Sequence, residues 1–108
     1  MTQASQLTES PDPLIQKVMR SLEVSQGITY TDFKRAFDWL NQTIRDVGAK
    51  NRVLVIDLAR EVPPVKENIA DVAHFNDHGS KLVAARIAAD LTPIIDQLAK
   101  KPLSGNHK

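Results

Sequence analysis

The sequence contains no cysteine and no long apolar run, and each absence excludes a class of protein. Without cysteine among its 108 residues, it can have no disulfide framework, no thiolate nucleophile and no thiolate zinc site. Its longest apolar runs are the four-residue segments Val53–Ile56 and Leu82–Ala85, whereas a membrane-spanning helix needs about 20 apolar residues. The first residues have neither a basic start nor an apolar stretch, so we expect no signal peptide and, by default, a cytoplasmic location.

An excess of charge of one sign is also missing. The chain has 14 lysine and arginine residues against 13 aspartate and glutamate residues, which gives a formal net charge of +1. This balance gives no electrostatic reason to expect a nucleic acid or an anionic membrane as a partner. The charged fraction of 25% and the hydrophobic fraction of 42% are ordinary for a globular protein, and the length suits one small domain.

Polar segments occupy both ends of the sequence. Residues 1–11 predict a polar leader, and residues 100–108 predict a polar tail. After the leader, Asp12 can cap a helix, and Pro13 suits its first position because the N–H that proline lacks would have no partner there. Apolar residues then recur at a spacing of about 3.6 residues, which predicts a short amphipathic helix over 13–23.

Two longer apolar stripes predict two further helices. The first stripe predicts a helix over 32–47, which Gly48 would end by adopting a left-handed conformation. The second predicts a helix over 78–99 that Asn76 can cap. Pro93 lies within this last helix and predicts a bend there.

Between these helices, residues 52–58 predict a strand. The continuous apolar run Val53–Ile56 is typical of a strand buried on both faces of a parallel sheet, so we expect an α/β fold. Asp57 would lie near the carboxyl end of this strand, where open α/β sheets bind ligands. We favour a structural part for it, as a carboxylate that bonds N–H groups of the following loop. The sequence offers no second strand to pair with it, and a lone strand is not a stable sheet. The chain therefore resembles one end of a larger α/β domain, or one copy of a chain that completes its sheet with another.

The densest cluster of chemically active side chains lies at residues 71–79. Histidine is the side chain whose ordinary pKa suits a general base near neutral pH. The carboxylate of Asp71, three residues earlier, can hold one ring nitrogen of His74 and leave the other for chemistry. Asp71 and His74 are therefore the candidate acid and base.

The order of these elements, with the motif D-x-x-H-F-N-D-x-G-S at 71–80, resembles the carboxyl-terminal part of the SGNH/GDSL-type serine hydrolases. The resemblance implies a partial three-layer α/β/α domain over residues 12–99, with its amino-terminal half absent. It further implies that Asp71 and His74 are the acid and base of a Ser-His-Asp triad that acts on carboxylic (acyl) esters.

The family's nucleophile block, Gly-Asp-Ser, is absent from this sequence. All serines of the chain lack that context: Ser5, Ser10, Ser21, Ser25, Ser80 and Ser104. The resemblance therefore implies a segment that is inactive alone. Its partner would be the missing amino-terminal hydrolase segment, and a small ester would bind only in the complete domain.

The sequence leaves two alternatives to a hydrolase segment. The first is a metal site. His74 and His78, with Asp71 or Asp77, have a spacing that metal ligands can use. Asn76 as a helix cap would leave His74 outside the helix, so we predict no metal ligand and no cofactor. The second alternative is a non-enzymatic interaction module: so few elements cannot cover all the predicted apolar faces, which favours a homo-oligomer over a stable monomer.

Overall fold

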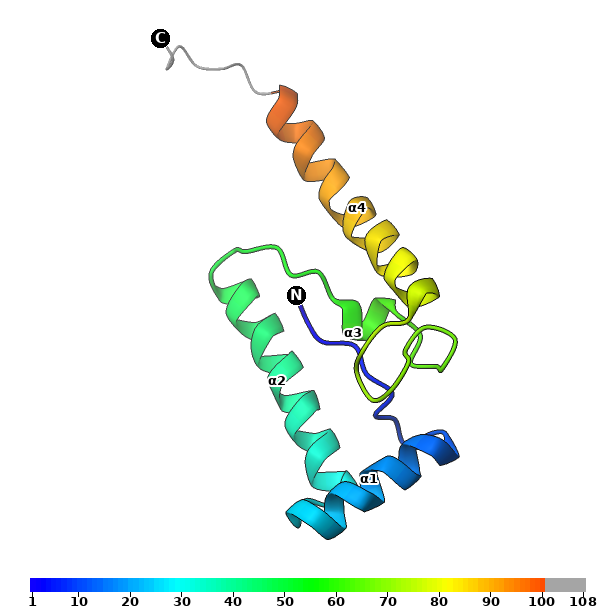
Figure 1. The fold of residues 1–108 in the computed structure, drawn as a ribbon. Coiled ribbons are helices and arrows are strands. Elements are labelled where there is room, and N and C mark those ends of the chain that lie inside the picture. Colours follow the sequence, from blue (N-terminus) through cyan, green and yellow to red (C-terminus); the bar gives the residue numbers. More distant parts are fainter. Residues whose placement is uncertain (101–108) are drawn as a thin grey trace.

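The computed structural model describes residues 1–100, which form helices joined by extended segments (Figure 1). Four helices follow one another along the chain: α1 (Pro13–Gln26), α2 (Tyr30–Lys50), α3 (Leu58–Glu61) and α4 (Asp77–Lys100). Within this described part no sheet forms, and the one isolated β-bridge joins Ile69 and Phe75 in antiparallel orientation. The predicted α/β fold, with its partial three-layer α/β/α architecture, is therefore wrong, and the described chain is a small helical protein.

The three helices predicted from apolar periodicity are confirmed, each somewhat longer than expected. A carboxylate oxygen of Asp12 accepts the N–H of Leu14 at 2.9 Å and caps α1 as predicted. α1 ends at Gly27, whose φ of 72° lies in the left-handed region that glycine adopts without steric cost. α2 begins after Thr29, whose hydroxyl accepts the N–H of Asp32 at 3.1 Å.

Gly48 does not end α2, as its predicted role required. It is buried inside α2, which continues to Lys50. A side-chain carbon at position 48 would collide with the side chain of Val55, and it would lie 3.2 Å from the carbonyl oxygen of Val53. The missing side chain therefore lets the extended segment that follows α2 lie directly against the helix.

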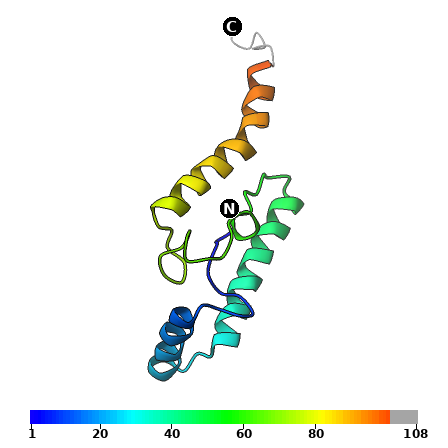
Figure 2. The ribbon, with the colours of Figure 1, turned by 90° about the vertical axis from the view of Figure 1, so that its right-hand side faces the viewer.

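α4 is the longest helix and begins at the predicted cap. The side-chain oxygen of Asn76 accepts the N–H of Gly79 at 2.8 Å. Pro93 lies inside the helix, and Figure 2 shows α4 changing direction along its length, because proline removes one backbone hydrogen bond and crowds the preceding turn. Neither α4 nor any other helix in residues 1–100 combines the length and the apolar character that crossing a membrane requires.

The predicted strand at 52–58 is wrong, although the chain there is extended. Residues 53–57 have no regular secondary structure, and Leu58 already belongs to α3. The N–H of Thr2 donates to the carbonyl of Ile56 at 3.1 Å, and one such bond does not make a ladder. A continuous apolar run predicts burial on both faces of a segment, but it does not provide the neighbouring strand.

The amino-terminal residues lie inside the fold, although their polarity predicts a leader. Ala4 and Gln6 are only 1% and 4% exposed. The side-chain amide of Gln6 donates to the carbonyls of Ile69 and Asp71, both at 2.8 Å. A polar side chain is tolerated in the interior when its donors have partners, which explains how a polar segment can be central to the structure.

Two small clusters of buried side chains hold these elements together. One lies between the amino-terminal segment, α3 and α4, and its fully buried members are Ala4, Leu58, Val62 and Ile69. The other lies between α1 and α2, and its buried members are Leu7 and, on α1, Ile15 and Met19. On α2 the rings of Phe33 and Phe37 cover this second cluster in a stacked arrangement, with centroids 5.8 Å apart.

The molecule is elongated, and much of its apolar surface is uncovered. Its radius of gyration is 18.1 Å and its extents are 63 × 30 × 20 Å, whereas a compact domain of this length has a radius of gyration of about 13 Å. Large apolar side chains that are more than half exposed occur on all three long helices and on the extended segment: Leu14, Val24, Trp39, Val47, Val53, Ile95 and Leu98.

We expect Gly79→Ala to destabilise the protein. Gly79 is buried in the first turn of α4, and a methyl group there would collide with the backbone carbonyl of Asn68. In an open helical position the change would stabilise by about 0.5–1 kcal/mol, but overpacking against backbone costs about 1–3 kcal/mol. Urea unfolding followed by circular dichroism measures the free energy of unfolding. The control is Ser80→Ala at the neighbouring exposed position, which should change it by less than about 0.5 kcal/mol; equal stability of the two variants would contradict the prediction.

Candidate functional site

Asp71 and His74 lie in the loop that connects α3 to α4, and the structure brings their side chains together. Nδ1 of the His74 imidazole lies 2.9 Å from Oδ2 and 3.1 Å from Oδ1 of Asp71. The loop is closed by the bridge between Ile69 and Phe75 and by a 2.7 Å bond from the N–H of Ala70 to the carbonyl of His74. The predicted acid and base are therefore in direct contact.

The Asp71 carboxylate is held by the backbone of its own loop. Its Oδ1 accepts the N–H of Ala73 at 2.9 Å and the N–H of His74 at 2.8 Å. These backbone hydrogen bonds, that of His74 first and that of Ala73 second, hold the pKa of Asp71 below its ordinary value, and the imidazole adds to them. The carboxylate is therefore ionised at neutral pH and fixed in orientation.

The imidazole of His74 presents its second nitrogen to solvent. Its side chain is 86% exposed, against 56% for Asp71. An ionised carboxylate can only accept hydrogen bonds, so the neutral imidazole carries its proton on Nδ1 and has a free lone pair on Nε2. Nε2 can take a proton from a hydroxyl placed against it. Within residues 1–100, the only side-chain partner of the imidazole is the Asp71 carboxylate.

His78 and His74 form hydrogen bonds to different side chains, so the structure does not direct both imidazoles at one metal ion. Nδ1 of His78 lies 2.8 Å from Oδ1 of Asn68, and His74 precedes the start of α4 at Asp77. Among the residues that the structure describes, no three histidine, aspartate or glutamate side chains come together as ligands. The geometry therefore gives the metal-site alternative no support.

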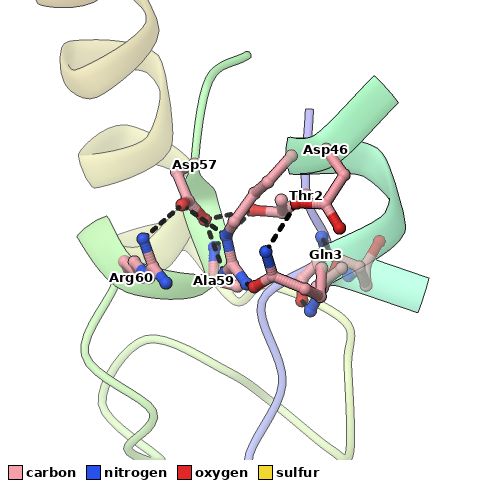
Figure 3. A network of polar contacts seen from close by, with 9 residues as sticks. Thr2, Gln3, Asp46, Asp57, Ala59 and Arg60 are labelled. Atoms are coloured by element: carbon pink, nitrogen blue, oxygen red, sulfur yellow. Dashed lines mark hydrogen bonds and ion pairs between the residues drawn. The ribbon is translucent and has the colours of Figure 1, made fainter. Parts of the chain in front are cut away.

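A second polar network, around Asp57, is one that the sequence did not predict (Figure 3). The Asp57 carboxylate accepts a hydrogen bond from Nε of Arg45 at 2.7 Å and a second from Nη2 of the same guanidinium at 3.0 Å. The Thr2 hydroxyl donates to Oδ1 of Asp57 at 2.7 Å and accepts the N–H of Ala59 at 2.9 Å. Arg60 approaches the carboxylate to 3.7 Å. This network joins the amino-terminal segment to α2 and α3.

The groups that bind Asp57 make it a structural carboxylate. The hydrogen bond from Arg45 is the largest cause of its lowered pKa, and the Thr2 hydroxyl contributes further. The side chains of Asp57 and Arg45 are only 21% and 19% exposed, so little of the pair remains for a ligand. The sequence located Asp57 at the end of an apolar run, but nothing in the sequence pattern identified Arg45, 12 residues earlier, as its partner.

Asn41 and Gln3 connect α2 with the loop of the acid–base pair, and sequence reasoning missed both. The N–H of Gln3 donates to the side-chain oxygen of Asn41 at 2.8 Å, and the side-chain amide of Asn41 donates to the Gln3 carbonyl at 2.9 Å. The side chain of Gln3 in turn donates to the carbonyl of Ala73 at 3.2 Å. Asn41 is 5% exposed, and a buried asparagine in an otherwise amphipathic stripe is the signal that could have identified this contact.

No protein-family model, curated protein or solved structure matches this chain. The resemblance to serine hydrolases therefore stays a prediction.

We expect the Asp57–Arg45 pair to make stability fall in acid. The folded-state pKa of Asp57 lies below its ordinary value of 3.8, so at low pH the unfolded chain binds more protons than the folded protein. The stabilisation is complete above about pH 5 and is lost as the pH falls through the ordinary value toward the folded pKa. At pH 7, Asp57→Asn should lower the free energy of unfolding by about 1–3 kcal/mol, because Arg45 loses its charged partner.

Urea unfolding of wild type and Asp57→Asn at pH 7, pH 5 and pH 3 measures this difference. The gap between the two proteins should be widest at pH 7 and should narrow at pH 3. Asp32→Asn is the matched control, because the one ion pair of the Asp32 side chain within residues 1–100 is an exposed contact of 3.9 Å with Arg35, which contributes little. A gap that is independent of pH would refute the assignment.

Proposed function

We propose that this chain supplies the acid–base half of a hydrolase that cleaves acyl esters. Asp71 orients His74, and His74 acts as the general base for a serine nucleophile that another polypeptide segment provides. The observation that carries the proposal is the contact of 2.9 Å between Nδ1 of His74 and Oδ2 of Asp71, made by an imidazole whose other side faces solvent.

The chemistry assigns a separate task to each group. As the serine oxygen attacks the ester carbonyl, its proton passes to Nε2 of His74. The imidazolium then gives that proton to the departing alkoxide, and water repeats the sequence on the acyl-serine. Asp71 holds the Nδ1 proton in place and stabilises the positive charge that forms on the ring. Because Asp71 is itself fixed by two backbone N–H groups, it can orient the imidazole without a further partner.

The mechanism needs two further parts, a serine nucleophile and donors for the negatively charged oxygen of the intermediate. In residues 1–100 no serine hydroxyl bonds to His74, and no serine of the sequence has the Gly-Asp context of a nucleophile. The donors that hold the negatively charged oxygen of the intermediate supply a large share of the rate enhancement in such enzymes, and they would come with the nucleophile. The partner in this proposal is therefore an amino-terminal hydrolase segment, and a small ester binds only to the assembled domain.

A non-enzymatic interaction module is the second candidate. The exposed large apolar side chains on α1, α2 and α4 favour it, since an exposed apolar patch marks an interface when such side chains lie together. The two functions are compatible, because a chain that contributes half of an active site must also bind the segment that contributes the rest.

We expect no ester turnover by the chain alone. Purified protein should hydrolyse p-nitrophenyl acetate no faster than free imidazole at the same concentration, and a fluorophosphonate probe should not label it, because no serine of residues 1–100 bonds to His74 and no serine of the sequence has the Gly-Asp context of a nucleophile. The measurements are absorbance of released nitrophenol and mass spectrometry of the probe-treated protein. Rapid hydrolysis that survives His74→Ala would refute the proposal.

We expect turnover when a hydrolase fragment that carries a Gly-Asp-Ser block is added and assembles with the chain. His74→Ala should then reduce kcat by about 10⁶-fold, and Asp71→Asn by about 10⁴-fold, because the second change disturbs the tautomer but leaves the base. His78→Ala is the matched control, since His78 contacts Asn68 and not Asp71, and it should retain activity. Equal loss in the His74 and His78 variants would contradict the assigned roles.

A further inference from the structure

Two carboxylic acid side chains meet where α4 leaves the rest of the molecule. Glu61 is the last residue of α3, and Asp90 lies on α4, three residues before Pro93. Their carboxyl groups lie within hydrogen-bonding reach of each other, and both line a cleft of about 530 Å³ that α3 and the segment before it form with α4. Residues 92–100 are all exposed, and Figure 1 shows α4 extending away from the other elements. The pair therefore marks the end of the docked part of α4.

The carboxyl group of Glu61 lacks a hydrogen-bond donor. Its Oε2 atom is buried and has no hydrogen-bond partner among residues 1–100. An ionised carboxylate can only accept hydrogen bonds, so Asp90 cannot supply the donor while both groups are charged. A buried acceptor without a donor is costly, and two neighbouring carboxylates repel each other. A proton on Glu61 removes both costs, because the protonated carboxyl group can donate to the Asp90 carboxylate.

The cations near the pair do not compensate for its negative charge. Arg60 approaches the Asp57 carboxylate to 3.7 Å. Arg86, four residues before Asp90 on α4, lowers the pKa of Glu61 through its charge, and Asp57 raises it. Burial of the carboxyl group and, second, the Asp90 carboxyl group have larger effects, and they raise the pKa of Glu61 above its ordinary value of 4.5. Glu61 therefore keeps its proton at a pH at which an exposed glutamate has lost it.

The part of α4 that precedes the pair covers a buried cluster. Leu82, Val83 and Ile87 pack against the cluster that contains Leu58 of α3. All three side chains remain partly exposed, so a contact at the end of this packing contributes strongly to holding the helix. Asp90 comes three residues after Ile87, a spacing that places both on one face of the helix. The carboxyl pair therefore extends the docked face of α4 by one turn.

We propose that Glu61 and Asp90 form a proton-dependent clasp, which holds α4 against α3 in mild acid and loosens it near neutral pH. In acid, the protonated Glu61 carboxyl group donates a hydrogen bond to the Asp90 carboxylate. When Glu61 loses this proton, two negative charges face each other, and α4 moves away and uncovers Val83 and Ile87. The stabilisation is complete below the ordinary pKa of 4.5 and is lost as the pH rises through the raised pKa of folded Glu61. The clasp does not depend on the hydrolase proposal.

The position of α4 at two pH values tests the clasp directly. The chain has no cysteine, so Lys50→Cys on α2 and Gln97→Cys on α4, both exposed, provide two sites for spin labels. The distance distribution from pulsed electron paramagnetic resonance should be narrow at pH 5 and broader at pH 7.5. Adding Glu61→Gln should keep it narrow at both, because the amide donates to Asp90 at every pH. Asp96→Asn, on the exposed end of α4, is the matched control and should keep the wild-type dependence on pH.

Urea unfolding measures the same proton without labels. One unit of pKa shift is tenfold in an equilibrium constant, so at pH 7.5 Glu61→Gln and Asp90→Asn should each unfold with an equilibrium constant about tenfold lower than that of wild type. The difference should disappear at pH 4.5, and comparison with wild type at each pH cancels the acid effect of Asp57, which all variants keep. A wild-type distance distribution that is the same at both pH values overturns the proposal. Broadening that persists in Glu61→Gln, or an Asp96→Asn variant that behaves like Glu61→Gln, also overturns it.

Discussion

The arrangement of the helices depends on the hydrogen bonds that hold the amino-terminal residues in the interior. The Thr2 hydroxyl donates a hydrogen bond to the Asp57 carboxylate at 2.7 Å. The guanidinium of Arg45 on α2 donates two more to the same carboxylate, at 2.7 and 3.0 Å. The bond from Thr2 to Asp57 joins residues 55 positions apart in the sequence, and the bonds from Arg45 join residues 12 positions apart, whereas few contacts join the helices directly. A polar segment can hold such a position because its buried polar side chains, those of Thr2 and Gln6, have hydrogen-bond partners.

The same segment fixes the loop of the acid–base pair relative to α2. Gln3 bonds to Asn41 on one side and to the carbonyl of Ala73 on the other, and Gln6 bonds to the carbonyl of Asp71. The backbone on both sides of the Asp71 carboxylate is thus anchored from the interior, while the imidazole stays at the surface. A reacting pair needs this division, because its supporting atoms must be rigid and its reactive nitrogen accessible.

Local patterns predicted the helices because caps and apolar periodicity act within a few residues. Asp12 and Asn76 cap where expected, and the contact between Asp71 and His74 could be predicted because only three residues separate them. The strand prediction failed at Val53–Ile56 because apolarity specifies burial and not hydrogen-bonded pairing. The burial of the amino-terminal residues was missed for a related reason. Thr2 and Gln6 are held in the interior by hydrogen bonds to residues 55 to 65 positions away, and no local spacing in the sequence predicts such partners.

One short path of hydrogen bonds joins the extended segment 53–57 to the loop of the acid–base pair. The carbonyl of Ile56 accepts the N–H of Thr2, and the side chain of the next residue, Gln3, donates to the carbonyl of Ala73 in that loop. Because the same amino-terminal residues bond to both, the position of the loop that holds His74 depends on how these residues pack, and not on contacts within the loop alone.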